Sequence, residues 1–179
     1  MKKTVAFWQL AGFLFTAAAG TLLHFLFEWT GRNAAMALFS AVNESIWEHL
    51  KLLFYPMVVF ALAEHRYWGK DCRSFWCIKC MGILFGLVFI PVAYYTYTGA
   101  FGIKADWFNI TLFFLAAGLI YWMETKLLQE NFVCRLPAKA AVAAICLIAV
   151  AFTVFTFWPL HIPLFIDPLT CTYGFWRNP

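Results

Sequence analysis

Long apolar runs separated by short polar stretches dominate the pattern of this chain. An α-helix needs roughly 20 residues to cross about 30 Å of hydrocarbon. Five runs meet that length, and none alternates with the period of two expected for the strands of a closed barrel. The pattern predicts an all-α, polytopic transmembrane helical bundle, with one integral membrane domain over residues 1–179. The expected spans are residues 5–29, 46–63, 78–99, 107–127 and 139–159.

The first run combines features of a signal peptide and of a retained span. Lys2 and Lys3 precede an apolar stretch, and the alanines at 17–19 resemble a cleavage site. The apolar run nevertheless continues through Leu22 to Phe27. We therefore interpret it as the first membrane span.

Composition supports a membrane protein, because 64% of the residues are hydrophobic and only 12% are charged. Soluble domains carry about 25% charged residues. The net charge of +4 therefore does not indicate nucleic-acid binding; its distribution about the spans matters instead. A cytoplasmic N-terminus places nine of the 13 lysines and arginines inside, which predicts that the C-terminus lies outside the cytoplasmic membrane. The nine are Lys2, Lys3, Arg66, Lys70, Arg73, Lys79, Lys126, Arg135 and Lys139.

The densest polar group, N-E-S-I-W-E-H-L-K at residues 43–51, opens the second span. On a helix, Glu44, Glu48 and Lys51 form one stripe, and His49 lies about 100° away. Acids in a first helical turn often serve only as caps, and S-x-x-E is a capping box. Capping does not explain a lysine inside the span or the neighbouring histidine. Ionisable groups at such positions usually face a bundle interior or a wet cavity.

Three of the four histidines fall on the predicted outer side: His24, His49 and His161. Three imidazoles with carboxylates nearby suit an open site for zinc or another divalent metal, with water in the fourth position. The proline-rich stretch at residues 159–168 ends the last helix. We expect the apolar tail to fold over the outer mouth of the bundle, carrying His161 and Asp167.

The residues around this expected metal site have candidate roles. Glu48 or Glu44 would act as general base, and Lys51 would stabilise a developing oxyanion. Tyrosines near the outer ends of spans are also typical of an interfacial belt. The predicted catalytic residues are Glu44, Glu48, Lys51 and Asp167, and the predicted substrate-binding residues are Glu28, Asn43, Trp47, Tyr95 and Tyr97.

The inner side shows no comparable polar set, and Glu124 is expected to be solvated there. Its cysteines include Cys72, Cys77 and Cys80, whose C-x4-C-x2-C spacing occurs in plant-type iron–sulfur proteins. Cys134 lies in the other inner loop. Because cytoplasmic thiols are normally reduced, we expect free thiols.

Three segments together resemble a known family: N-E-S-I-W-E-H-L-K, Y-Y-T-Y-T-G and the tail H-I-P-L-F-I-D-P-L-T-C-T-Y-G. The family comprises small multi-pass bacterial membrane proteins labelled as a domain of unknown function, and the resemblance covers nearly the whole chain. It implies the helical fold and the outer cluster, and it supplies no activity. The residues that carry it are Asn43, Glu44, Trp47, Glu48, His49, Lys51, His161, Pro163, Asp167 and Gly174.

Three functions compete at this point. The first is a metal-dependent membrane hydrolase or transferase that acts on a lipid or small amphiphile. The second is a binding or transport module for a small solute or ion, which would need a membrane partner or a homo-oligomer because no inverted repeat is visible. The third is a structural protein whose charged groups tie helices together through buried ion pairs.

Overall fold

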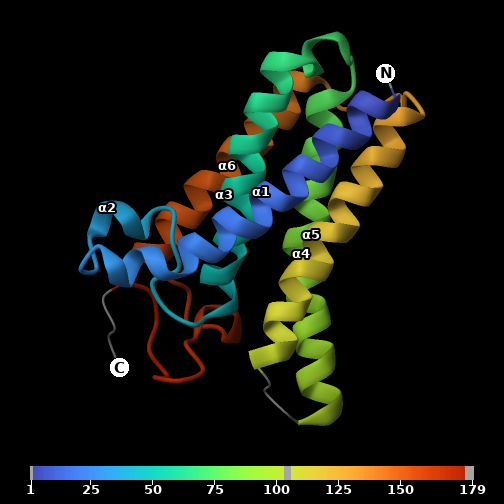
Figure 1. Ribbon diagram of the computed structural model, residues 1–179. Helices are drawn as coiled ribbons and strands as arrows, with labels where there is room; N and C mark the ends of the chain where they lie inside the picture. The colour runs from blue at the N-terminus through green and yellow to red at the C-terminus, as the bar shows by residue number, and fades with distance from the viewer. Residues whose placement is uncertain (1, 103–105, 176–179) are drawn as a thin grey trace.

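The computed structural model describes residues 2–102 and 106–175, which form helices and connecting loops without a named strand (Figure 1). Helix α2 is a single turn, and two short 3-10 helices, Gly69–Asp71 and Pro163–Phe165, lie in the connections. The helices are α1 (Lys2–Trp29), α2 (Ala34–Ala37), α3 (Ile46–Tyr67), α4 (Phe75–Phe101), α5 (Asp106–Gln129) and α6 (Ala138–Phe157).

Within the described residues, five helices are long and apolar enough to cross a membrane, which confirms the predicted fold class. The fold is thus that of a multi-pass membrane protein. Helices α3 and α4 continue beyond their apolar runs, to Tyr67 and back to Phe75. The last helix ends at Phe157, two residues before the predicted boundary, because Trp158 leaves the helical conformation ahead of Pro159.

The long helices alternate in direction, so the bundle has two distinct ends. We call the end that carries α2, the start of α3 and residues 158–175 the tail end. The opposite end, called the amino-terminal end, carries the start of α1 and the loops 68–74 and 130–137. In Figure 1, the end of α4 and the start of α5 lie apart from α2 and from residues 158–175.

The largest buried apolar cluster joins α3, α4, α5 and α6 through residues such as Phe54, Ile83, Ile120 and Phe152. Helix α1 packs against α3 and α5, where small residues allow a close approach. A Cβ at Gly20 would lie 2.6 Å from the backbone oxygen of Leu52. Thus α1 and α3 pack closely near the tail end, with the backbone of one helix against that of the other.

The C-terminal tail folds back onto the bundle, as the sequence predicts. Phe165 is buried and its ring lies 4.8 Å from that of Trp47. The Phe175 N–H donates to the Thr156 carbonyl at 2.8 Å. The tail therefore covers the ends of α3 and α6.

Candidate functional site

The connection before α3 sets the positions of the polar residues at the tail end. Ser45 is the N-cap of α3, and its hydroxyl accepts from the Glu48 N–H at 3.3 Å. The Ser45 N–H donates to the Asn43 side chain at 2.9 Å, where a capping box would use Glu48. Only half of the predicted capping box therefore forms, and the Glu48 carboxylate is directed elsewhere.

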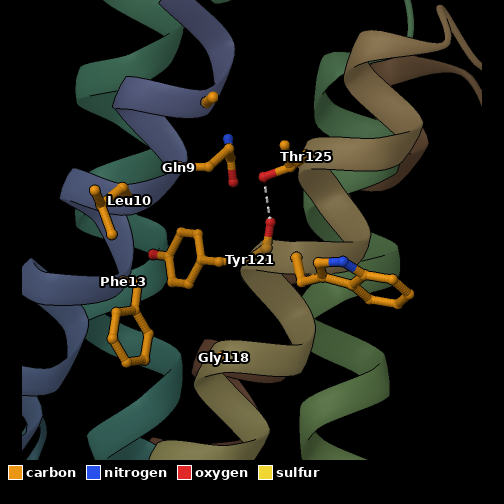
Figure 2. A pocket seen from close by; sticks show the side chains of 8 residues that line it. Gln9, Leu10, Phe13, Gly118, Tyr121 and Thr125 are labelled. Carbon is orange, nitrogen blue, oxygen red and sulfur yellow. Dashed lines mark hydrogen bonds between the residues drawn. The ribbon is translucent and has the colours of Figure 1, made fainter. Parts of the chain in front are cut away.

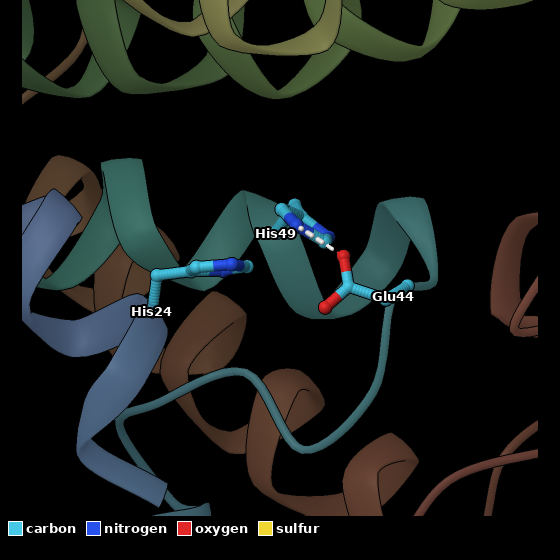
Figure 3. Close-up of side chains that lie close together, drawn as sticks. All are labelled: His24, Glu44 and His49. Atoms are coloured by element: carbon cyan, nitrogen blue, oxygen red, sulfur yellow. Dashed lines mark ion pairs between the residues drawn. The ribbon is translucent and has the colours of Figure 1, made fainter. Parts of the chain in front are cut away.

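Glu44 precedes the helix and does not share a stripe with Glu48 and Lys51, so that prediction is wrong. Its side chain instead faces His49, with Oε2 and Nε2 3.3 Å apart (Figure 3). His24 reaches the same place from α1, and the two histidine rings lie 5.2 Å apart. Ligand atoms of these three residues all lie within 4.8 Å of one another.

The hydrogen bonding of His49 prepares Nε2 to bind a cation. Its Nδ1 lies 2.9 Å from the Ser45 carbonyl, which only accepts, so Nδ1 carries a proton. In neutral imidazole the Nε2 lone pair then faces the Glu44 carboxylate, and two acceptors repel unless a proton or metal ion lies between them. Metal-binding histidines are usually held in this way by a backbone carbonyl.

Electrostatics at Glu44 favour its ionised form. The hydrogen bond from His49 and the positive charge of the two imidazoles hold the pKa of Glu44 below its ordinary value, although partial burial opposes the shift. Glu44 is exposed and the histidines are half-buried, so solvent reaches the group.

Tetrahedral zinc places ligand atoms about 3.3 Å apart. The Glu44–His49 separation fits that value, and His24 must approach.

Glu48 and Lys51 lie apart from this group, in a closed buried network. The Lys51 ammonium lies 2.5 Å from Glu48 Oε2 and donates to the Ala37 carbonyl at 2.8 Å and the Thr156 hydroxyl at 3.0 Å. Glu48 also accepts from the Val42 N–H at 3.1 Å. All three ammonium protons have acceptors, and the network ties the α1–α3 connection and α6 to α3.

His161 and Asp167, the predicted metal ligand and catalytic acid from the tail, lie outside the His24–Glu44–His49 group. The exposed His161 ring contacts Tyr173, 4.7 Å between centroids. The buried Asp167 carboxylate accepts from the Leu169 N–H at 2.8 Å and the Thr170 hydroxyl at 2.9 Å. Asp167 therefore shapes its own turn.

Three predicted substrate-binding residues, Glu28 of α1, Asn43 and Trp47, have contacts with other parts of the chain. The exposed Glu28 forms an ion pair with Arg32 at 3.1 Å. The Asn43 side chain accepts a hydrogen bond from the Ser45 N–H and donates one to the Gly174 carbonyl at 3.3 Å. Trp47 packs among aromatic rings of α6 and the tail, and its indole nitrogen has no hydrogen-bond partner among the described residues.

The other two, Tyr95 and Tyr97, lie near the end of α4, on the hairpin that is set apart from α2 and the tail (Figure 1). Tyr95 is exposed beside Tyr94. Tyr97 stacks on Phe108 of α5, with centroids 3.8 Å apart. The contact between Tyr97 and Phe108 therefore joins the end of α4 to the start of α5.

A second polar cluster lies at the amino-terminal end of the bundle, which is the predicted inner side. The expectation that this side has no comparable polar set is therefore wrong. It brings together one buried polar residue from each of α1, α3, α4 and α5. Glu124, expected to be solvated, is fully buried and accepts from Lys79 at 2.6 Å. The four residues are Gln9, Glu64, Lys79 and Glu124.

Two cysteines at the same end form a disulfide, so the expectation of free thiols is wrong for this pair. Cys77 of α4 forms a disulfide with Cys134, with Cα atoms 6.3 Å apart. Cys72 and Cys80 are free. The bond removes Cys77 from the C-x4-C-x2-C set, which excludes a three-thiolate cluster in this state.

Comparison with known proteins gives a match to a protein family. No curated protein and no solved structure is significantly similar to the chain. A family model described as a family of unknown function (DUF6512) matches residues 1–175, which is nearly the whole length. The chain, with its five candidate spans and its His24–Glu44–His49 group, therefore belongs to this family of unknown function.

Proposed function

We propose that His24, Glu44 and His49 bind one divalent metal ion, zinc in particular, and that the protein is a metal-dependent membrane hydrolase or transferase. The convergence of three ligand atoms within 4.8 Å carries this proposal. Two imidazoles and one carboxylate are a ligand set used by catalytic zinc sites, which keep a fourth position for water. Nitrogen ligands favour zinc and other transition metals over calcium or magnesium.

The chain's own groups would divide the work at this site. The Ser45 carbonyl fixes the orientation of His49, and Glu44 supplies negative charge beside Nε2. A bound zinc ion supplies an acidified water and polarises a substrate oxygen. The buried Glu48–Lys51 pair keeps the start of α3 in place, which makes its role one of positioning rather than of contact with substrate.

The surroundings of the site support a lipid or small amphiphile as substrate. His24 lies five residues before the end of α1 at Trp29, and Glu44 lies in the connection just outside α3. The neighbouring Leu22 and Phe25 are exposed on the same helix, as expected for a surface in contact with lipid. A substrate with one polar and one apolar part fits a site where polar residues lie beside a lipid-facing surface.

Metal content of purified, detergent-solubilised protein tests the proposal. We expect about one zinc ion per chain, lost in His24→Ala, His49→Ala and Glu44→Ala. The matched control is His161→Ala, which removes an exposed imidazole outside the group and should leave zinc unchanged. The zinc-loaded protein should cleave or transfer an acyl or phosphoryl group of an amphiphilic substrate, and the chelated protein should not.

Two results would contradict the proposal. Folded wild-type protein that binds no zinc after incubation with the metal would exclude a metal site. Zinc binding that survives all three ligand substitutions would place the metal elsewhere. If the three variants lost zinc and the zinc-loaded wild type catalysed no reaction, the metal site would be supported and the enzymatic role would be excluded.

The alternative is a small-solute or ion binding or transport module that works with a membrane partner or as an oligomer. The buried polar cluster at the amino-terminal end favours it, because the polar residues then occur toward both ends of the bundle. Metal-independent uptake of a solute by proteoliposomes would support this function over hydrolysis.

We also propose a cytoplasmic N-terminus in a bacterial inner membrane, which places the tail end and its metal site outside. The distribution of lysine and arginine supports this orientation. The disulfide between Cys77 and Cys134 at the amino-terminal end favours the opposite one, because cytoplasmic thiols are normally reduced. A membrane-impermeant maleimide should then label the exposed Cys171 in intact spheroplasts. Labelling that requires opened membranes would reverse the orientation.

A further inference from the structure

The polar cluster at the amino-terminal end places two carboxylates around one ammonium. Lys79 Nζ lies 2.6 Å from Glu124 Oε2 and also contacts Glu64 Oε2. Lys79 is 2% exposed, and both glutamates are fully buried. Gln9 donates to Glu64 Oε1 at 2.7 Å, so four helices meet at this cluster.

The charges of this cluster do not balance when every group is ionised. Two carboxylates and one ammonium leave one negative charge in a part of the bundle that excludes water. An uncompensated buried charge is costly, and two carboxylates that share a site rarely both ionise. A single proton removes the imbalance.

Among the described residues, the Glu124 carboxylate has an oxygen with neither a hydrogen bond nor an ion pair. Glu124 Oε1 has no hydrogen-bond partner among the described residues, although its side chain is fully buried. It lies against Gly82 of α4, where a Cβ would come within 2.3 Å of it. An ionised oxygen in that position would be far less stable than the oxygen of a neutral carboxyl group.

We propose that Glu64, Lys79 and Glu124 form a proton-binding site, in which two carboxylates share one ammonium and hold one further proton taken from solvent. The charged and titratable groups that face Glu124 are Lys79 from α4, Glu64 from α3 and Tyr121 from α5. Helix α1 contributes the neutral Gln9. The site is separate from the metal-binding residues, which lie at the tail end.

A pocket between α1 and α5 leads toward this site (Figure 2). It encloses about 260 Å³, and its rim includes the exposed Leu10 and Trp122. Gln9 and Tyr121 lie on its walls, and Gln9 is the side chain that hydrogen-bonds to Glu64. Gln9 therefore contacts both the pocket and the proton-binding site.

Infrared spectroscopy of the purified full chain in lipid nanodiscs tests the proposal. Exposed carboxyl groups are ionised at neutral pH, so the carbonyl stretch of an un-ionised carboxyl reports a buried one. We expect one such group per chain. Glu124→Gln and Glu64→Gln should each abolish the band, because either leaves one carboxylate for one ammonium.

The matched control is Glu130→Gln, which changes an exposed glutamate just beyond α5 and should preserve the band. Absence of an un-ionised carboxyl in folded wild-type protein at neutral pH would overturn the proposal, whatever the variants do. A band that persists in either glutamine variant would also overturn it. The wild-type measurement keeps the test decisive if one variant fails to fold.

Discussion

The Lys51 ammonium lies 2.5 Å from the Glu48 carboxylate, and neither side chain is exposed to solvent. The pair connects three parts of the chain, because Lys51 also donates to the Ala37 carbonyl and to Thr156. This arrangement gives a stabilising role to two residues whose types and sequence positions suggest catalysis.

Neutralising one partner of this pair should destabilise the fold. Glu48→Gln or Lys51→Met leaves one buried charge without its partner, at a cost of about 3–5 kcal/mol. Thermal unfolding in detergent should show the loss. Glu28→Gln is the control, because an exposed ion pair contributes about 0–1 kcal/mol. Unchanged stability in Lys51→Met would contradict the structural role.

Packing around Glu124 can be tested at a glycine. In Gly82→Ala the new methyl group would lie 2.3 Å from Glu124 Oε1 and 2.9 Å from Ile120, so these buried side chains must shift. Overpacking of this kind costs about 1–3 kcal/mol. Gly118→Ala is the matched control on α5, since its nearest neighbour is 3.9 Å away. Equal melting temperatures for the two variants would contradict the described contact.

Docking of the tail depends on Gly174. Its φ of +58° disfavours any side chain, and a Cβ there would lie 2.7 Å from the Thr156 carbonyl. Gly174→Ala should therefore loosen the tail by about 1–3 kcal/mol and speed its cleavage by protease. Gly99→Ala, where a Cβ meets nothing within 4 Å, should cleave like the wild type. Equal cleavage rates in both variants would show that Gly174 does not hold the tail.

Thiol counting tests the disulfide between Cys77 and Cys134. Purified protein denatured without reductant should expose four thiols, those of Cys72, Cys80, Cys146 and Cys171. Reduction should raise the number to six. Cys134→Ser should expose all five remaining thiols without reductant. Six thiols in the unreduced wild type would mean that the bond does not form in the purified protein.

The polar cluster at the amino-terminal end was not predicted from the sequence, and the pattern of α3 and α5 explains why. Glu64 follows Met57 and Ala61 at helical spacing on the buried face of α3, and Glu124 follows Ile120 on the buried face of α5. A charged residue at the next position of a buried stripe was the available signal. It is weak in membrane spans, because lipid-facing positions are apolar too and the stripe does not stand out.

The helical class and the five spans follow from the length and hydrophobicity of the apolar runs, since a membrane span must satisfy its backbone hydrogen bonds internally. The polar residues at the start of α3 can likewise be read from the sequence. Their partners depend on the packing of the helices. Ser45 caps α3, so Glu44 stays outside the helix and joins His24 and His49, while Glu48 turns inward to Lys51. Contacts between residues far apart in the chain depend on how helices pack, which spacing along one helix does not specify.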